Sequence, residues 1–184
     1  MALDIKRKGY GQVEPNHLSA QYTGQIYAQL PAMTVSGNTK TAIDQLENGQ
    51  FLKYNYKDGV ASVTGDGEWM LVYNEEKRYD PRLGGHKDFC VKAEDMMDKT
   101  IYPRLLKTNI GDIFTTNTFG TAATGPNDVQ ASAVTLTVGN KLYVGATGFL
   151  TGTAPENYKG PVFQVVKEYN LADMQNAVKL QRIE

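Results

Sequence analysis

The fold is decided by the stretch Leu46-Glu47-Asn48-Gly49-Gln50-Phe51-Leu52-Lys53-Tyr54-Asn55-Tyr56, which predicts a turn followed by a β-strand. Apolar or aromatic residues occupy four of the six positions from Phe51 to Tyr56. Alternation along a strand places Phe51, Lys53 and Asn55 on one face and Leu52, Tyr54 and Tyr56 on the other.

Two tight turns and two further strands follow this stretch. Lys57-Asp58-Gly59 predicts a hairpin turn, because Asp and Gly tolerate a positive φ angle. A second strand is expected over 60–63, and Gly65-Asp66-Gly67 turns the chain into a third strand over 68–73. Three strands joined by tight turns predict an antiparallel meander.

The same turn pattern returns near the C-terminal end, in Leu136-Thr137-Val138-Gly139-Asn140-Lys141-Leu142-Tyr143-Val144-Gly145. Residues 110–116 are expected to form a turn into a strand, and other short strands are expected over 133–138, 141–144, 149–150, 162–166 and 177–183. Turn signals at intervals of about 8–12 residues indicate an all-β fold, a small antiparallel barrel or sandwich. No long amphipathic helix separates the strands, so a doubly wound α/β fold is disfavoured.

Three segments are expected to be less regular. Residues 41–49 can form one or two helical turns, which Thr39 or Thr41 would cap and Gly49 would end. Residues 74–87 and 120–128 are expected to be polar loops, and the conformation of 92–110 is left open.

Composition fits a soluble globular chain without a strong charge field. The chain has 184 residues, 41% of them apolar, and a net charge of −1, so nothing draws it to nucleic acid or an anionic membrane. Its single cysteine, Cys90, excludes an internal disulfide. No apolar run approaches the roughly 20 residues of a membrane helix. The basic start of the chain lacks the apolar segment of a signal peptide, so synthesis in the cytoplasm is expected.

Residues 1–40 differ from residues 41–184, which are expected to form the β-domain. Gly and Pro interrupt any long element in this first segment, yet it carries several large apolar side chains. One interpretation is an extended arm that lies across another subunit. The alternative is a loop-rich segment folded onto its own domain.

The sequence contains no motif that supports catalysis or cofactor binding. Asp80, His86, Asp88 and Cys90 contain metal-ligating groups, but their spacing matches no known metal site. The serines lie in no nucleophile-elbow pattern, and the glycine-rich run at 145–148 lacks the Lys-Ser/Thr of a phosphate loop. The expectation is a protein without enzymatic activity, metal or cofactor.

Aromatic residues of the first strands are better explained by packing than by nucleic-acid binding. Tyr54, Tyr56, Trp69 and Tyr73 could stack on bases, but the charges between them are net negative. They are expected to serve the core or an interface.

Four phrases carry a resemblance to a known family: Asn48–Tyr54, Gly111–Asn117, Val138–Gly145, and Phe163–Glu168 followed by Ala177–Leu180. Over residues 46–184 the chain resembles capsid decoration proteins of tailed bacteriophages, also called cement or auxiliary head proteins. The resemblance implies a β-barrel or β-tulip module with an N-terminal arm, no enzymatic activity, and a place in many copies on the outer capsid of the virion. It implies the major capsid protein as partner, with neighbouring copies of this chain as a second possibility, and neither nucleic acid nor membrane.

In that role the N-terminal segment supplies the contacts. Aromatic and large apolar side chains dominate interface energetics, and basic side chains would meet an acidic capsid surface. The expected partner-binding residues are Lys6, Arg7, Lys8, Tyr10, Tyr22, Ile26, Tyr27 and Leu30.

Two alternatives stay open. One is another virion role, as a tail, connector or host-attachment component. The other is a carbohydrate-binding β-domain, which acids and aromatic residues gathered in one cleft would support.

Overall fold

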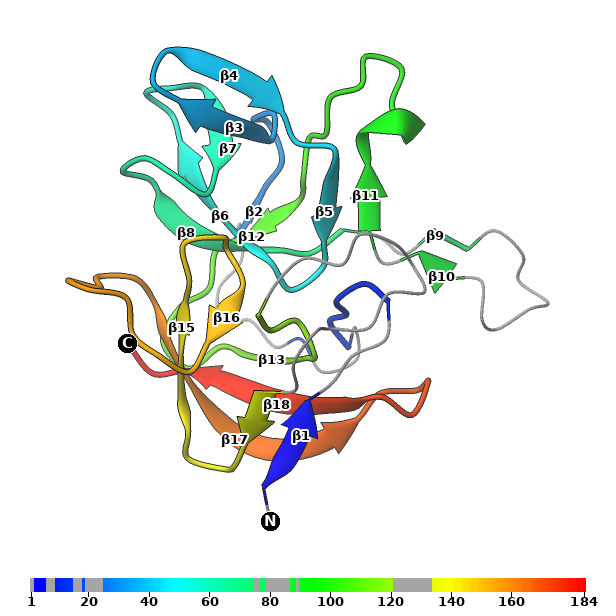
Figure 1. The fold of residues 1–184 in the computed structure, drawn as a ribbon, viewed down its shortest axis with the longest axis vertical. Coiled ribbons are helices and arrows are strands. Elements are labelled where there is room, and N and C mark those ends of the chain that lie inside the picture. Colours follow the sequence, from blue (N-terminus) through cyan, green and yellow to red (C-terminus); the bar gives the residue numbers. More distant parts are fainter. Residues whose placement is uncertain are drawn as a thin grey trace.

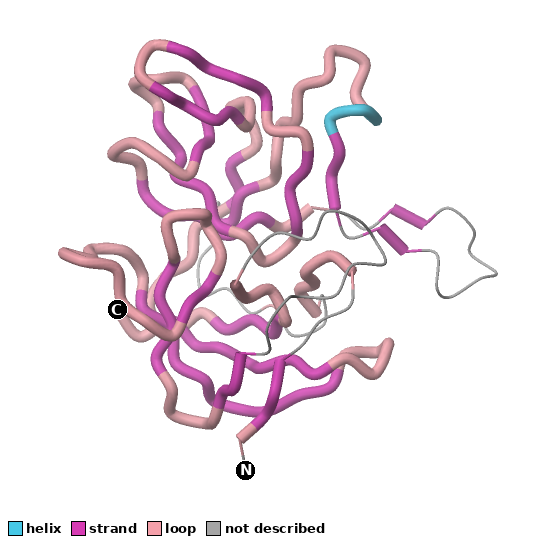
Figure 2. The backbone as a smooth tube through the Cα atoms, viewed as in Figure 1, coloured by secondary structure: helices cyan, strands magenta, loops and turns pink. Residues whose placement is uncertain are grey.

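The computed structural model describes residues 2–5, 9–14, 18, 25–74, 77–78, 87–88, 90–120 and 134–184. Strands dominate these residues, and the helix that they contain is a single 3-10 turn, η2 (Ala93–Asp95), as Figure 2 shows. The prediction of an all-β fold with antiparallel sheets is confirmed. Within the described ranges, no helix has the length and apolar character of a membrane span.

Most strands belong to two five-stranded antiparallel sheets, which lie one above the other in Figure 1. The first sheet has the order β2-β12-β8-β6-β7 and is formed by β2 (Ile26–Tyr27), β6 (Phe51–Asn55), β7 (Val60–Ser62), β8 (Glu68–Val72) and β12 (Leu105–Leu106). The second sheet has the order β13-β18-β17-β15-β16 and is formed by β13 (Ile113–Thr116), β15 (Lys141–Val144), β16 (Leu150–Thr151), β17 (Val162–Asn170) and β18 (Asn176–Arg182).

Two-stranded pairs complete the described structure. They are β1 (Leu3–Ile5) with β14 (Val134–Leu136), β3 (Met33–Ser36) with β4 (Thr39–Ala42), β5 (Gln45–Glu47) with β11 (Cys90–Lys92), and β9 (Lys77–Arg78) with β10 (Lys87–Asp88).

The two five-stranded sheets have the same topology. If the strands of each sheet are counted in chain order, both sheets place the first strand beside the fifth, then the fourth, the second and the third. The residue register agrees as well. The row Tyr27–Leu105–Val72 of the first sheet corresponds to the row Phe114–Leu180–Val165 of the second. The chain therefore contains a structural duplication.

The repeated turn pattern of the sequence occupies corresponding positions in this duplication. Gly49 and Gly139 stand before β6 and β15 with φ angles of 90° and 94°. The Gly49 N–H donates to the Val72 carbonyl at 3.0 Å, and the Gly139 N–H donates to the Val165 carbonyl at 2.8 Å. Glycine adopts this left-handed backbone without steric cost, and in both sheets it starts the second strand.

Each sheet is also bridged from one edge to the other. Beyond β2 the chain reaches Ala32, which forms a parallel bridge to Ala61 in β7 at the opposite edge. Beyond β13 the chain reaches Phe119, which bridges Leu150 in β16 in the same way. The two edges of each sheet therefore approach each other at one point.

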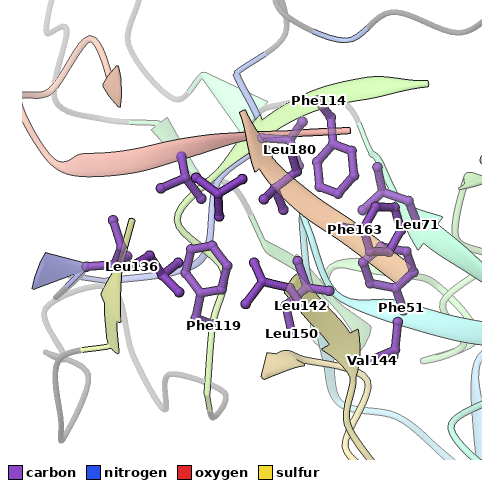
Figure 3. Packing of buried hydrophobic residues seen from close by; sticks show 14 of the residues in the cluster. Phe51, Leu71, Phe114, Phe119, Leu136, Leu142, Val144, Leu150, Phe163 and Leu180 are labelled. Carbon is purple, nitrogen blue, oxygen red and sulfur yellow. The ribbon is translucent and has the colours of Figure 1, made fainter. Parts of the chain in front are cut away.

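Each sheet packs on a core of its own, filled largely by corresponding positions. The first core consists of Ala32, Leu46, Leu52, Tyr54, Ala61, Met70, Val72, Ala93, Ile101 and Leu105. The second core, shown in Figure 3, consists of Ile5, Val13, Phe51, Leu71, Leu106, Phe114, Phe119, Leu136, Leu142, Val144, Leu150, Phe163, Val165, Val178 and Leu180.

The second core also receives side chains from the first sheet. Phe51, Leu71 and Leu106 are neighbours in register on the face of the first sheet that points away from its own core. The Phe51 ring centroid lies 5.4 Å from that of Phe163 and 6.3 Å from that of Phe114 (Figure 3). The first sheet is thus covered by apolar groups on both faces.

The second sheet has a polar outer face. The positions that correspond to Phe51, Leu71 and Leu106 hold Lys141, Gln164 and Gln181, which are exposed or half-buried. This difference explains why one sheet can dock its outer face on its neighbour and the other sheet can face solvent.

Two expectations about local structure are wrong. Residues 41–49 form no helical turn, because β4 and β5 use this segment for strand pairing. The three strands β6, β7 and β8 are not a meander, since β6 lies between the other two and β8 crosses to its far side. Gly67 allows this crossing, because a Cβ atom there would stand 2.5 Å from the Tyr54 carbonyl oxygen.

Candidate functional site

The expected partner-binding residues fall into three groups. Lys6, Arg7, Lys8 and Tyr22 lie outside the described residues. Ile26 is 52% exposed on the edge strand β2. Tyr10 is buried against Cys90, whereas Tyr27 and Leu30 are half-buried against the first core. Packing within the chain therefore occupies Tyr10, Tyr27 and Leu30.

The described parts of residues 1–40 are hydrogen-bonded into the body of the molecule. The strand β1 pairs with β14, β2 belongs to the first sheet, and the predicted boundary at residue 40 falls inside β4. The Gly11 N–H donates to the Glu47 carboxylate at 2.7 Å, and the Gln12 N–H donates to the Asn117 side-chain oxygen at 2.8 Å. This is the arrangement expected of the alternative in which the segment folds onto its own domain.

The residues considered for a metal site do not form one where the structure describes them. Asp80 and His86 lie outside the described residues, and Cys90 is a buried thiol that donates to the Val91 carbonyl at 3.6 Å. No group of three or more His, Cys, Asp or Glu side chains in the described ranges could hold a metal ion.

An open pocket of about 740 Å³ lies where the two sheets meet. Its walls come from the loop 63–67, which joins β7 to β8, and from residues 155–161 of the loop that joins β16 to β17. These two loops are the corresponding crossovers of the duplicated topology. We call this cavity the crossover pocket.

Two aromatic side chains form part of the pocket wall. A Cβ atom on Gly160 would stand 2.5 Å from the Tyr158 hydroxyl oxygen and 2.9 Å from Cδ1 of Trp69, so the absence of a side chain lets both aromatic groups approach this point. The Lys53 ammonium nitrogen lies 5.0 Å from the centroid of the Trp69 ring, within cation–π range.

Tyr158 is fixed by its hydroxyl group. The hydroxyl donates to the Pro161 carbonyl at 2.8 Å and accepts from the Val144 N–H at 2.9 Å. Burial raises the pKa of Tyr158 to about 12, which keeps the side chain neutral below that pH. These hydrogen bonds hold the Tyr158 ring in the pocket wall and join it to Val144 of β15.

A neighbouring corner connects the two sheets through polar side chains. The Lys107 ammonium contacts the Glu68 carboxylate at 2.9 Å, and this hydrogen bond raises the pKa of Lys107. The Gln25 side-chain amide donates to the Lys107 carbonyl at 2.8 Å and to the Asp112 carboxylate at 2.9 Å. Gln25, which precedes β2, thus links Lys107, which follows β12, to Asp112 in the turn that leads into β13.

Comparison with family models, curated proteins and solved structures finds no match to this chain.

The amino-acid sequence alone does not predict the pocket. The local pattern predicts a simple turn at Gly65-Asp66-Gly67 and a packing role for Trp69, because a local pattern carries no information on sheet order or on the path of a crossover. The one feature of the sequence that points to the pocket is the repeated turn pattern at 46–54 and 136–144. A duplicated fold brings corresponding loops into comparable positions.

Proposed function

We propose that this protein is a non-enzymatic virion protein that binds the outer surface of a tailed-bacteriophage capsid and stabilises the contacts between capsid subunits. The resemblance in sequence suggests the role, and one structural observation supports it: the chain is a block of two sheets with the same topology and a shared core. Such a block can contact two neighbouring copies of a repeating partner, and linked contacts gain strength from each other.

Exposed apolar side chains on both parts of the block supply candidate contacts. Large apolar side chains that are more than half exposed include Ile26, Tyr56, Met97 and Tyr102 in or near the first sheet, and Val138 and Met174 in the second part of the chain. Side chains of this size contribute most to binding when an interface removes them from water. In the proposal, the major capsid protein covers some of these groups on each side of a subunit seam.

Within the N-terminal segment the proposal keeps Ile26 and the basic cluster Lys6, Arg7 and Lys8 as contacts. Tyr10, Tyr27 and Leu30 instead hold the segment to the body. We also propose that each sheet closes into a small barrel-like module. The bridges that Ala32 and Phe119 form to the opposite edges of their sheets support this closure.

The proposal is tested by adding the purified full chain to capsids assembled from the major capsid protein of the same virus. We expect the chain to sediment with the capsids in a fixed ratio to the major capsid protein and to raise the temperature at which they open. A few copies per particle would indicate a tail, connector or host-attachment role instead. No association at any ratio would overturn the proposal.

Side-chain substitutions test the contact residues better than truncation does. Deletion of residues 1–35 would remove β1 and β2 from their sheets, so it would confuse folding with binding. Ile26→Asp should weaken capsid association at least tenfold, since a charge would be buried in the contact, while Ile26→Leu should bind like the parent. Equal binding of both variants would remove Ile26 from the interface.

A further inference from the structure

The crossover pocket has the dimensions of a ligand site. Binding sites for small molecules are concave, enclose a few hundred to about 1,000 Å³, and combine apolar walls with a few polar groups. The crossover pocket, at about 740 Å³, has aromatic groups on one wall and ionisable side chains around it. Both crossover loops are needed to form it, so it belongs to the duplicated architecture rather than to either sheet alone.

The charges around the pocket balance. Three cationic side chains line it, Lys53, Lys159 and Arg182, and three carboxylates line it, Asp66, Glu68 and Glu156. A site for phosphate or another strong anion would carry an excess of basic groups, and a site for a cation would carry an excess of acids. The balance favours a ligand without net charge.

Several of these ionisable groups already have partners. The Lys53 ammonium donates to the Gly65 carbonyl at 2.7 Å, and Glu68 pairs with Lys107. The Arg182 guanidinium donates to the Glu184 carbonyl at 2.8 Å and to the Thr108 carbonyl. These contacts occupy hydrogen-bond donors of Lys53 and Arg182, pair Glu68 with a lysine outside the pocket lining, and hold the wall in place.

Two carboxylates stay available for a ligand. Asp66 and Glu156 come from opposite crossover loops, and neither makes a hydrogen bond or ion pair to the described residues. An ionised carboxylate accepts several hydrogen bonds and donates none. The ligand that suits them carries several hydroxyl or amide donors.

The aromatic wall supplies the apolar part of such recognition. Trp69 is half-buried in the wall, and the Tyr158 ring stands beside the same glycine. The flat surface of an aromatic ring packs well on the C–H face of a sugar ring. Carboxylates at the rim of the pocket can accept hydrogen bonds from the sugar hydroxyl groups. From the neutral charge balance, the free acceptors and the aromatic wall together, we infer that the crossover pocket binds a neutral oligosaccharide.

The single tryptophan of the chain gives a direct test, because Trp69 is the only indole fluorophore. The full chain is titrated with maltotriose, cellotriose, tri-N-acetylchitotriose and a β-galactobiose, each up to about 10 mM, and the emission of Trp69 is followed. We expect a saturable change with at least one of these saccharides. No saturable change with any of them overturns the inference.

Three variants separate binding in this pocket from binding elsewhere. Asp66→Asn and Glu156→Gln should each weaken the binding about five- to tenfold, because each removes a charge-assisted hydrogen bond without removing a folded-state partner. Asp44→Asn is the matched control, since Asp44 is an exposed acid outside the pocket, and it should bind like the parent. Unchanged affinity in both pocket variants would overturn the assignment of the site.

Charged probes test the ligand class. Glucose 6-phosphate and sialyllactose should bind more weakly than the neutral saccharide of best affinity. Tighter binding of either anionic probe would contradict the inference that the ligand is neutral. These outcomes do not depend on whether the chain associates with capsids.

Discussion

The first and second sheets share one topology and one register, but they differ on their outer faces. The first sheet places Phe51, Leu71 and Leu106 there, and the second places Lys141, Gln164 and Gln181 at the corresponding positions. The difference shows how a duplicated fold becomes a single body. The first sheet has an apolar outer face, which the second sheet covers. The second sheet has a polar outer face, which can stay in contact with solvent.

The largest expected effect separates the two outer faces. Phe51→Ala should lower the free energy of unfolding by about 3–5 kcal/mol, because a ring that is buried among Phe114 and Phe163 leaves a cavity. Lys141→Ala, at the corresponding position, should stay within about 0.5 kcal/mol. Urea denaturation of both variants measures the contrast. Equal losses would mean that the two faces are equally covered.

Substitutions on the core-facing sides of the two sheets should lower stability by similar amounts. Leu52 and Leu142 occupy corresponding positions and are fully buried in their respective cores. Leu52→Ala and Leu142→Ala should each cost about 2–5 kcal/mol in urea denaturation. A loss below about 1 kcal/mol in one of them would show that its core is not packed as the other is.

Alanine substitutions at the two turn glycines, Gly49 and Gly139, should lower stability by different amounts. Gly139→Ala should cost about 1–2 kcal/mol, because the residue has a positive φ angle but no atom lies within 4 Å of an added Cβ. Gly49→Ala should cost about 1–3 kcal/mol more, because its Cβ atom would stand 2.5 Å from Oγ1 of Thr118 and 2.7 Å from Oγ1 of Thr116. Thermal unfolding of the two variants compares them directly. A Gly139 variant that is as unstable as the Gly49 variant would contradict the account of these contacts.

The smallest expected effect concerns pH. The pKa of Tyr158 in the folded chain is about 12, above the ordinary value of about 10, so the unfolded chain loses this proton first. The contribution of Tyr158 to stability is therefore complete below pH 10 and is lost as the pH rises from about 10 to about 12. Urea denaturation at pH 9 and pH 11.5 measures the loss, which Tyr158→Phe should reduce. An equal loss in the variant would assign it to other groups.

Much of the secondary structure followed from the sequence. The turns at Asp58-Gly59 and before β15, and the strands β6, β8, β13, β17 and β18, follow from glycine positions and from apolar alternation. These signals are local, so they survive without knowledge of the tertiary fold.

The sheet order and the pocket did not follow from the sequence. Crossing of β8 over β6 depends on the close approach at Gly67, and pairing of β4 overrides the helical pattern of 41–49. The burial of Tyr10 depends on contacts with residues far along the chain. Such non-local pairings leave no periodic signal in the segments that make them.

An electron cryomicroscopy reconstruction of capsids decorated with the full chain would test the proposal that the two-sheet block bridges neighbouring capsid subunits. We expect density for both sheets on the outer surface, with the first and the second sheet in contact with different subunits. Density in which one sheet alone contacts the capsid, or capsids without added density, would contradict it.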